Sequence, residues 1–257
     1  MLLSLASSLY RDVVILGLWL KEMKEIKEFV KSVPIIGPLA RNVYGLLRRG
    51  RLPFPGSREY WELRYTRGDA SGFGSCGILA VFKARIVNSF VSENDIHSVI
   101  EFGCGDGNQL SLANYPAYLG LDVSRTAIAL CNKRFHNDET KSFFLYDPEC
   151  FVDKHSVFKA DLTLSLDVIF HLVEDTVFEL YMQHLFSAAT RFAIIYSSDT
   201  DLPAPAPHVK HRRFSRWVEL HLPEWKLLER IPNEYPWKGD DRTGSLSDFF
   251  IYGKAGT

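Results

Sequence analysis

Residues 99–108 read VIEFGCGDGN, and this stretch decides the fold. A mostly apolar segment runs into three glycines at alternate positions, Gly103, Gly105 and Gly107. Glycines spaced this closely let the backbone turn sharply and approach a ligand at the carboxyl end of a buried strand. The sequence therefore predicts a strand over 98–102 that ends in a ligand-binding loop.

The residues around this loop indicate which ligand it takes. Asn108 stands where a dinucleotide fingerprint has its last glycine, so a pyrophosphate seat is not supported. Glu101, within the strand, would repel a pyrophosphate but favours an ammonium group such as that of a methionine moiety. Asp122 closes the next strand, where an acid accepts hydrogen bonds from ribose hydroxyls. Together these residues predict a ligand made of adenosine with a cationic tail, and not NAD.

Strands and helices alternate through the rest of the chain, which predicts crossover connections and a parallel sheet. The last two strands are joined only by a turn-rich segment, so we expect them to pair antiparallel. The expected strands are 98–102, 117–121, 141–145, 162–166, 192–196, 225–231 and 247–252, and the expected helices are 57–65, 78–91, 109–114, 125–135, 176–189 and 214–220.

Three segments carry a resemblance to a known family. EFGCGDG (101–107) resembles the glycine-rich first motif of class I S-adenosylmethionine-dependent methyltransferases, and GLDVS (120–124) resembles their acidic second motif. DLTLSLDVIFHL (161–172) is similar to their fourth motif, where a strand ends beside the transferable methyl. The resemblance covers residues 57–252. It implies an α/β Rossmann-like fold with a seven-stranded, mostly parallel sheet, a terminal antiparallel hairpin, and S-adenosyl-L-methionine as cofactor.

The resemblance also assigns the residues of a cofactor site. Asp122 would hold the ribose, Val123 would pack on the adenine, and Asp147 would meet the adenine amino group unless it is simply a turn residue before Pro148. The residues implied at the methionine end are Glu101, Gly103, Cys104, Gly105 and Gly107.

EYWELRY (59–65) resembles a lid that precedes the core in several small-molecule methyltransferases. In that lid Arg64 would face the cofactor carboxylate, and Tyr60 and Trp61 would cover the sulfonium by cation–π contact. The alternative for both aromatic residues is ordinary core packing. The glycine-rich residues 71–77 would form an adjoining closure loop.

Methyl transfer is an in-line displacement, so the protein must align the groups, exclude water and remove a proton from a hydroxyl acceptor. Asp167 and His171 follow the fourth strand and are candidate bases, with a helix N-cap and a structural histidine as the alternatives. His208 and His211 lie in PHVKHRRF (207–214), whose cations would suit an anionic acceptor or would simply begin a solvated helix. No residue spacing supports a metal site.

The first 56 residues are predicted to form a helical extension, and residues 57–257 the methyltransferase domain. Apolar residues at helical spacing predict a helix over 5–31, and a second over 39–49. The apolar run 13–20 would span about 12 Å as a helix, against about 30 Å of bilayer hydrocarbon, so neither a transmembrane span nor a signal peptide is expected. Residues 1–50 would pack on the domain as a lid, or dock on a membrane face or a partner.

Bulk composition narrows the partners. The formal net charge of −1 gives no field that would favour nucleic acid. The four cysteines form no C-x-x-C pair, which indicates reduced thiols and a cytoplasmic protein.

PIIGPL (34–39) and YGLLRR (44–49) resemble N-terminal segments of methyltransferases and glycosyltransferases of bacterial cell-surface polysaccharide assembly. This resemblance implies O-methylation of a sugar or sugar phosphate, with residues 1–50 at the inner membrane or on an assembly partner. Two alternatives stay open, namely a small-molecule or protein N-methyltransferase and a non-catalytic scaffold. The fourth strand lacks the Asp/Asn-Pro-Pro-Tyr/Phe run of nucleobase methylation. The sequence predicts no oligomeric state.

Overall fold

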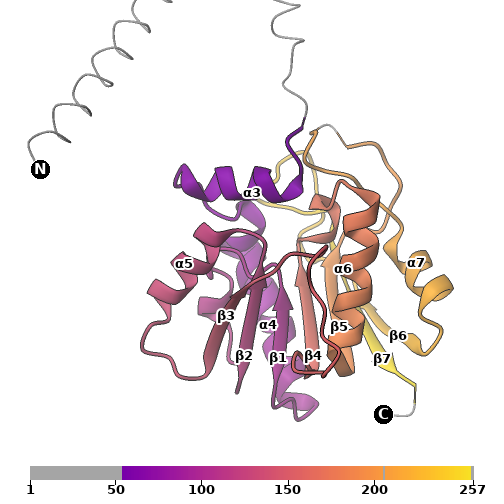
Figure 1. The fold of residues 1–257 in the computed structure, drawn as a ribbon. Coiled ribbons are helices and arrows are strands. Elements are labelled where there is room, and N and C mark those ends of the chain that lie inside the picture. The colour runs from indigo at the N-terminus through magenta and orange to yellow at the C-terminus, as the bar shows by residue number, and fades with distance from the viewer. Residues whose placement is uncertain (1–53, 205, 256–257) are drawn as a thin grey trace, which may run out of the picture. The chain divides into compact units, whose positions relative to one another are not determined.

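The computed structural model describes residues 54–204 and 206–255. These residues form a sheet of seven strands in the order β3-β2-β1-β4-β5-β7-β6, with helices on both faces (Figure 1). The helices expected over 5–31 and 39–49 lie outside the described residues. No helix in the described ranges is both long and apolar enough to cross a membrane.

The element bounds follow the predicted alternation. The strands are β1 Val99–Phe102, β2 Tyr118–Asp122, β3 Lys141–Leu145, β4 Ala160–Leu166, β5 Ala189–Ser197, β6 Trp225–Ile231 and β7 Asp248–Lys254. The α-helices are α3 Ser57–Thr66, α4 Gly77–Glu93, α5 Arg125–Arg134, α6 Asp175–Ala188 and α7 Phe214–His221, and the 3-10 turns are η1 Phe73–Ser75, η2 Leu110–Leu112 and η3 Ile169–His171.

The pairing of the strands confirms the expected fold class. Strands β1 to β5 are parallel to one another, whereas β7 runs antiparallel to both β5 and β6. Parallel strands place their carboxyl ends at one edge of the sheet. The ends of β1, β2, β4 and β5 therefore meet at one edge, where sheets of this type bind ligands.

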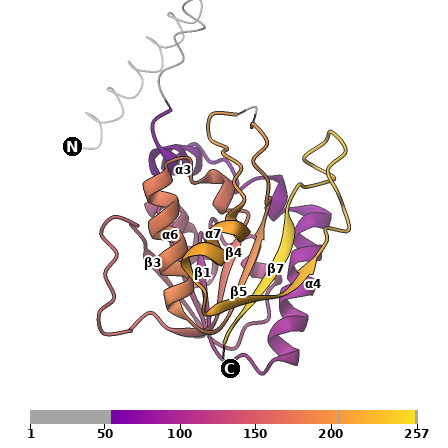
Figure 2. The ribbon, with the colours of Figure 1, turned by 90° about the vertical axis from the view of Figure 1, so that its right-hand side faces the viewer.

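The core lies in two layers, one on each face of the sheet. Helices α6 and α7 cover one face and α4 the other (Figure 2). Consecutive strand residues point to opposite faces. Accordingly Ile194 packs in the cluster beneath α4, and its neighbour Ile195 packs in the cluster beneath α6. Both faces of the central strands are buried, as their nearly continuous apolar sequence predicts.

One expected helix is wrong. The segment 109–114 forms only the 3-10 turn η2, because Ala113 has an extended backbone (φ −89°, ψ 146°) and Pro116 follows closely. Asn88 holds the turn from α4, since its Nδ2 donates to the Leu112 carbonyl at 3.0 Å and its Oδ1 accepts from the Asn114 N–H at 2.9 Å. The helix that packs beside β1 is therefore α4, which precedes it in the chain.

We predict that Leu164→Ala lowers the free energy of unfolding by about 2–5 kcal/mol. Leu164 lies in the middle of β4 with none of its surface exposed, so truncation leaves a cavity that the surrounding strands cannot fill. Urea unfolding measures the change. Leu220→Ala is the control, because Leu220 on α7 is 69% exposed and its truncation should cost less than about 0.5 kcal/mol. Equal losses in the two variants would contradict this account of the core.

Candidate cofactor and acceptor site

A cavity of about 1010 Å³ opens at the carboxyl edge of the sheet. It is lined by α3, by the loop after β1, and by the residues that follow β2, β3, β4, β5 and β6. Its charged lining is mostly acidic, with nine carboxylates and only three cations, Arg58, Arg64 and Lys83. This excess of negative charge favours a cationic ligand and disfavours an anionic one.

The three glycines after β1 are required by the backbone. Gly103, Gly105 and Gly107 all have positive φ, at 87°, 58° and 74°. A Cβ atom on Gly103 would lie 2.5 Å from Val168 Cγ2, and one on Gly105 would lie 2.5 Å from Ser71 Oγ. The loop therefore admits no side chain at these positions, and Gly103 and Gly105 line the cavity directly. Gly107 is not part of the lining, and a Cβ atom on it would meet Phe135 and Cys131.

Asp122 ends β2 and is held by the neighbouring backbone. Its Oδ2 accepts from the Gly105 N–H at 2.9 Å, and its Oδ1 accepts from the Ser124 N–H at 2.8 Å. Burial raises the pKa of Asp122 to about 6, against the opposite effect of these two hydrogen bonds. Each carboxylate oxygen keeps a further lone pair, so Asp122 can still accept from ligand hydroxyls in the cavity that it and Val123 line.

Glu101 is a carboxylate inside the sheet, directly below the glycine loop. It is 4% exposed, and its Oε2 accepts from the Tyr118 hydroxyl at 2.6 Å. Burial raises the pKa of Glu101 to about 7. A cation is attracted by the ionised carboxylate and not by the neutral acid. A cationic ligand in the cavity would therefore bind more tightly once Glu101 has lost its proton.

Helix α3 is anchored to the domain at both ends. At its start, Ser57 Oγ lies 2.6 Å from Glu174 Oε2 and accepts from the Val173 N–H at 3.1 Å. Further along, Glu62 accepts from the Ser124 hydroxyl at 2.6 Å and from Thr126. The helix thus lies across the carboxyl edge of the sheet (Figure 1), and several of its residues line the cavity.

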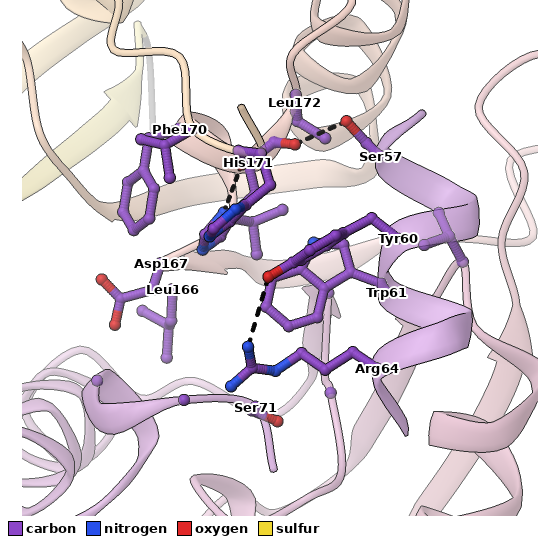
Figure 3. Close-up of a pocket in the computed structure, with 18 of the residues that line it drawn as sticks. Ser57, Tyr60, Trp61, Arg64, Ser71, Leu166, Asp167, Phe170, His171 and Leu172 are labelled. Atoms are coloured by element: carbon purple, nitrogen blue, oxygen red, sulfur yellow. Dashed lines mark hydrogen bonds between the residues drawn. The ribbon is translucent and has the colours of Figure 1, made fainter. Parts of the chain in front are cut away.

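The lid residues face the predicted histidines. Tyr60 stacks on His208 with ring centroids 4.5 Å apart. Trp61 meets His171 edge-on at 4.8 Å (Figure 3). The Arg64 guanidinium lies 5.5 Å from the Trp61 ring centroid and donates to the Ala70 carbonyl at 2.7 Å. Four predicted residues from separate parts of the chain, namely the lid aromatics and two of the candidate bases, therefore come together.

Ser71 and Asp106 belong to the site although the sequence analysis did not single them out as binding residues. The Ser71 N–H donates to Asp106 Oδ2 at 3.3 Å, and the Asp106 N–H donates to Ser71 Oγ at 3.2 Å. The Tyr65 hydroxyl lies 3.0 Å from the same Oγ. These bonds hold the segment after α3 against the glycine loop, and only the density of glycines in 68–77 hinted at such a close approach.

The three candidate histidines all line the cavity and are uncharged near neutral pH. Burial lowers the pKa of His171 to about 4, and it lowers the pKa values of His208 and His211 as well. His171 Nδ1 lies 3.0 Å from the His208 carbonyl, which can only accept, so Nδ1 carries the proton and Nε2 keeps a lone pair. His211 Nδ1 lies 2.7 Å from Ser198 Oγ. A neutral imidazole with a free nitrogen can act as a general base.

Asp167 is not a helix N-cap but one half of an ion pair. Its Oδ2 lies 2.6 Å from Lys83 Nζ, and its Oδ1 accepts from the Ser247 hydroxyl at 3.1 Å. The sequence analysis missed Lys83, although it lies four residues after Leu79 and four before Val87, on the buried stripe of α4. A lysine on an apolar stripe was the signal that could have found it.

The cations of 207–214 do not line the cavity. Lys210 and Arg212 both pair with Asp175, Arg212 also donates to the Leu172 and Val173 carbonyls, and Arg213 pairs with Asp201 at 3.4 Å. They brace this loop rather than face a ligand, which corrects the expectation of an anion-binding cluster. Asp147 lines the cavity and pairs with Arg58 at 2.7 Å. Within the described ranges no group of histidines, cysteines and carboxylates could hold a metal ion.

No family model matches the sequence, and no curated protein matches it. Solved structures do match the fold. They include the magnesium protoporphyrin IX methyltransferase of Synechocystis PCC 6803 with bound SAH (15% identity, TM-score 0.56, covering 77% of this chain and 98% of that one). They also include the N-methyltransferase NodS of Bradyrhizobium japonicum WM9 (14%, 0.54, 68% and 94%) and the methyltransferase domain of bacterial CtHen1-C (19%, 0.52, 68% and 99%). The chain has the Rossmann-like fold of S-adenosylmethionine-dependent methyltransferases.

We predict that Glu101→Gln changes the pH dependence of stability. The pKa of Glu101 is about 7 when folded, against an ordinary 4.5, so the folded state gains stability from protonated Glu101 at low pH and loses it as the pH rises through 7. The substituted amide can still accept from Tyr118 and stays neutral. The variant should therefore match the wild type near pH 4.5 and exceed its stability by about 3 kcal/mol at pH 8. Urea unfolding across this range tests the difference, and parallel curves would contradict it.

Proposed function

We propose that this protein transfers a methyl group from S-adenosyl-L-methionine to a hydroxyl of a glycan. The observation that carries the cofactor assignment is the pair of buried carboxylates, Glu101 and Asp122, on either side of a loop whose three glycine positions admit no side chain. An acid at the end of β2 suits ribose hydroxyls, and an acid below the loop suits an ammonium group. The fold is that of proteins that use this cofactor, one of which has SAH bound.

The chain's own residues would hold each part of the cofactor, which supplies an electrophilic methyl group on a sulfonium. Asp122 would accept from the ribose hydroxyls, and Val123 would pack on the adenine. Arg64 would pair with the carboxylate, while the rings of Tyr60 and Trp61 would offer their faces to the positive sulfur. The acidic lining of the cavity favours this net positive ligand.

For a hydroxyl acceptor, we infer that His171 is the general base. Its Nδ1–H is held by the His208 carbonyl, which leaves Nε2 free to take the acceptor proton as the methyl is transferred. Burial and the rings of Trp61 and Phe170 (Figure 3), together with that of His208, fix the orientation of the imidazole. Asp167 is less suited to this role, because protonating it would leave the buried Lys83 ammonium without a counter-charge.

Within this proposal the acceptor is an uncharged sugar rather than a sugar phosphate. Neutral imidazoles and aromatic rings, among them Phe170 and Trp237, line the acceptor end of the cavity, and the cations of 207–214 are paired elsewhere. The resemblance of residues 34–49 to cell-surface glycan enzymes supports the same acceptor class. On that basis we propose cytoplasmic action, with residues 1–50 docking at the inner membrane or on an assembly partner.

We predict that Asp122→Ala weakens binding of S-adenosylmethionine and S-adenosylhomocysteine at least about tenfold, because charge-assisted hydrogen bonds to the ribose are lost. Calorimetric titration measures both ligands, with NAD as a comparison. Asp138→Ala is the control, since this half-buried acid pairs with Lys141 away from the cavity. Preference for NAD, or no binding of either adenosyl compound to the wild type, would rule out the proposed cofactor.

We predict that His171→Phe lowers kcat by about 10²–10⁴-fold with little change in cofactor affinity, because the ring contacts remain and the base is lost. Because the pKa of His171 is about 4, the wild-type rate at saturating S-adenosylmethionine should be level from pH 6 to 8. S-adenosylhomocysteine release in the presence of neutral glycan fractions, sugar phosphates and amine acceptors gives the rate. His221→Phe, on α7 outside the cavity, is the control. Turnover only with amines would rule out a glycan acceptor but would still support methyl transfer as the activity.

A further inference from the structure

Lys83 is a buried cation that the proposed mechanism does not use. Its side chain is 1% exposed, on a helix whose neighbouring positions Leu79 and Val87 lie in the core. Burying an ammonium is costly unless a counter-charge compensates it. Here Nζ lies 2.6 Å from Asp167 Oδ2 and 5.4 Å from the centroid of the Tyr196 ring. An apolar residue would fill this position at lower cost, so the pair serves something besides stability.

The carboxylate of Asp167 is clasped from three directions by separate segments. Lys83 comes from α4, Ser247 from the residue before β7, and Gly74 from η1, where a Cβ atom would lie 2.6 Å from Asp167 Oδ2. The backbone of Asp167 is itself strained, with φ 60°, a left-handed conformation that non-glycine residues rarely adopt. Strain and a close-fitting glycine at one carboxylate indicate that its position is tightly specified.

The clasp leaves part of the carboxylate free. An ionised carboxylate can accept about four hydrogen bonds. Lys83 takes one at Oδ2 and Ser247 takes one at Oδ1, so one direction remains on each oxygen. The side chain of Asp167 is 16% exposed and lines the cavity, where Figure 3 shows its carboxylate directed into the space below Phe170 and His171. The two carboxylate oxygens can therefore each accept one further hydrogen bond from a pair of neighbouring donors.

The charge balance decides which donors fit. Lys83 already cancels the charge of Asp167, so the pair offers an amine or guanidinium little net attraction. The carboxylate oxygens repel phosphate and carboxylate groups. Two adjacent hydroxyl groups match the free oxygens without adding charge, just as ribose hydroxyls match an acid at the end of a strand.

We propose that Asp167 binds a vicinal diol of an uncharged sugar acceptor, and that Lys83 is the positioning residue that fixes the carboxylate for it. This inference rests on the proposed function and narrows its substrate to sugars with two adjacent free hydroxyls. Asp167 then touches the acceptor without being the base, and Lys83 acts on the acceptor through Asp167. Lys83 also attracts the Glu101 carboxylate and lowers its pKa, so acceptor binding is compared with the cofactor site already filled. Removing Lys83 should then weaken acceptor binding.

Saturation-transfer NMR on the full chain, saturated with S-adenosylhomocysteine, tests the diol site without needing turnover. The probes are methyl mannopyranoside and methyl galactopyranoside, their 3-deoxy counterparts, which keep no two adjacent ring hydroxyls, glucosamine and a hexose phosphate. We expect the wild type to bind the diols in preference to the deoxy sugars. Lys83→Met should weaken the diols about tenfold and leave the deoxy sugars unchanged, which a general loss of structure would not do.

Two further variants keep the test decisive. Arg85→Met removes an ion pair from the same helix, to Glu234, outside the cavity, and should behave as wild type. Ser247→Ala removes the second clasp without stranding a buried charge, so it reports even if Lys83→Met fails to fold, and we expect diol affinity to fall severalfold.

Separate outcomes overturn the inference and the proposed function. Provided that calorimetry shows S-adenosylhomocysteine bound, the diol site would be overturned if diols and deoxy sugars bound equally or if no diol bound. It would also be overturned if Ser247→Ala or a folded Lys83→Met bound the diols with wild-type affinity. A wild type that does not bind S-adenosylhomocysteine would overturn the proposed function and this inference with it.

Discussion

The hydrogen bond from the Gly105 N–H to Asp122 Oδ2 joins the two halves of the site, and much else depends on it. It connects the loop after β1 to the end of β2. Only glycine fits at position 105, because a side chain there would clash with Ser71 and Tyr65. Placing a carboxylate there costs free energy, as the raised pKa of Asp122 shows. The folded protein nevertheless keeps a buried acid beside the backbone of the glycine loop. Hydrogen bonds from the hydroxyl groups of a ligand would recover part of that free energy.

Electrostatics divide the cavity into two ends of different character. Beside the glycine loop the acids outnumber the cations, and burial raises the pKa of Glu101 to about 7. Toward β5 and β6 the lining carries less charge, with three uncharged imidazoles, the internally balanced pair of Asp167 and Lys83, and one carboxylate, Asp241, that accepts from Trp237. A positive ligand at one end and an uncharged one at the other is the division that methyl transfer from a sulfonium to a sugar hydroxyl would need.

The sequence predicted those features that depend on local pattern. Strand positions, the antiparallel end of the sheet and the glycine loop all follow from periodicity and spacing, and the observed strands lie close to the expected ranges. The helix expected over 109–114 failed because a partner distant in sequence, Asn88, completes a turn instead. The cations of 207–214 were misjudged for a similar reason, since Asp175 lies far along the chain from Arg212. Lys83 and Ser247 lie at core positions and become visible only when three segments meet around Asp167.

The stacking of Tyr60 on His208 has a consequence for any exchange of the loop after β5. Tyr60 belongs to the lid that would cover a cofactor, whereas His208 belongs to the loop after β5, on the acceptor side. Exchanging that loop to obtain a new acceptor specificity would remove the ring on which the lid rests. A loop graft here would therefore disturb helix α3 as well, unless it carried an aromatic ring at position 208.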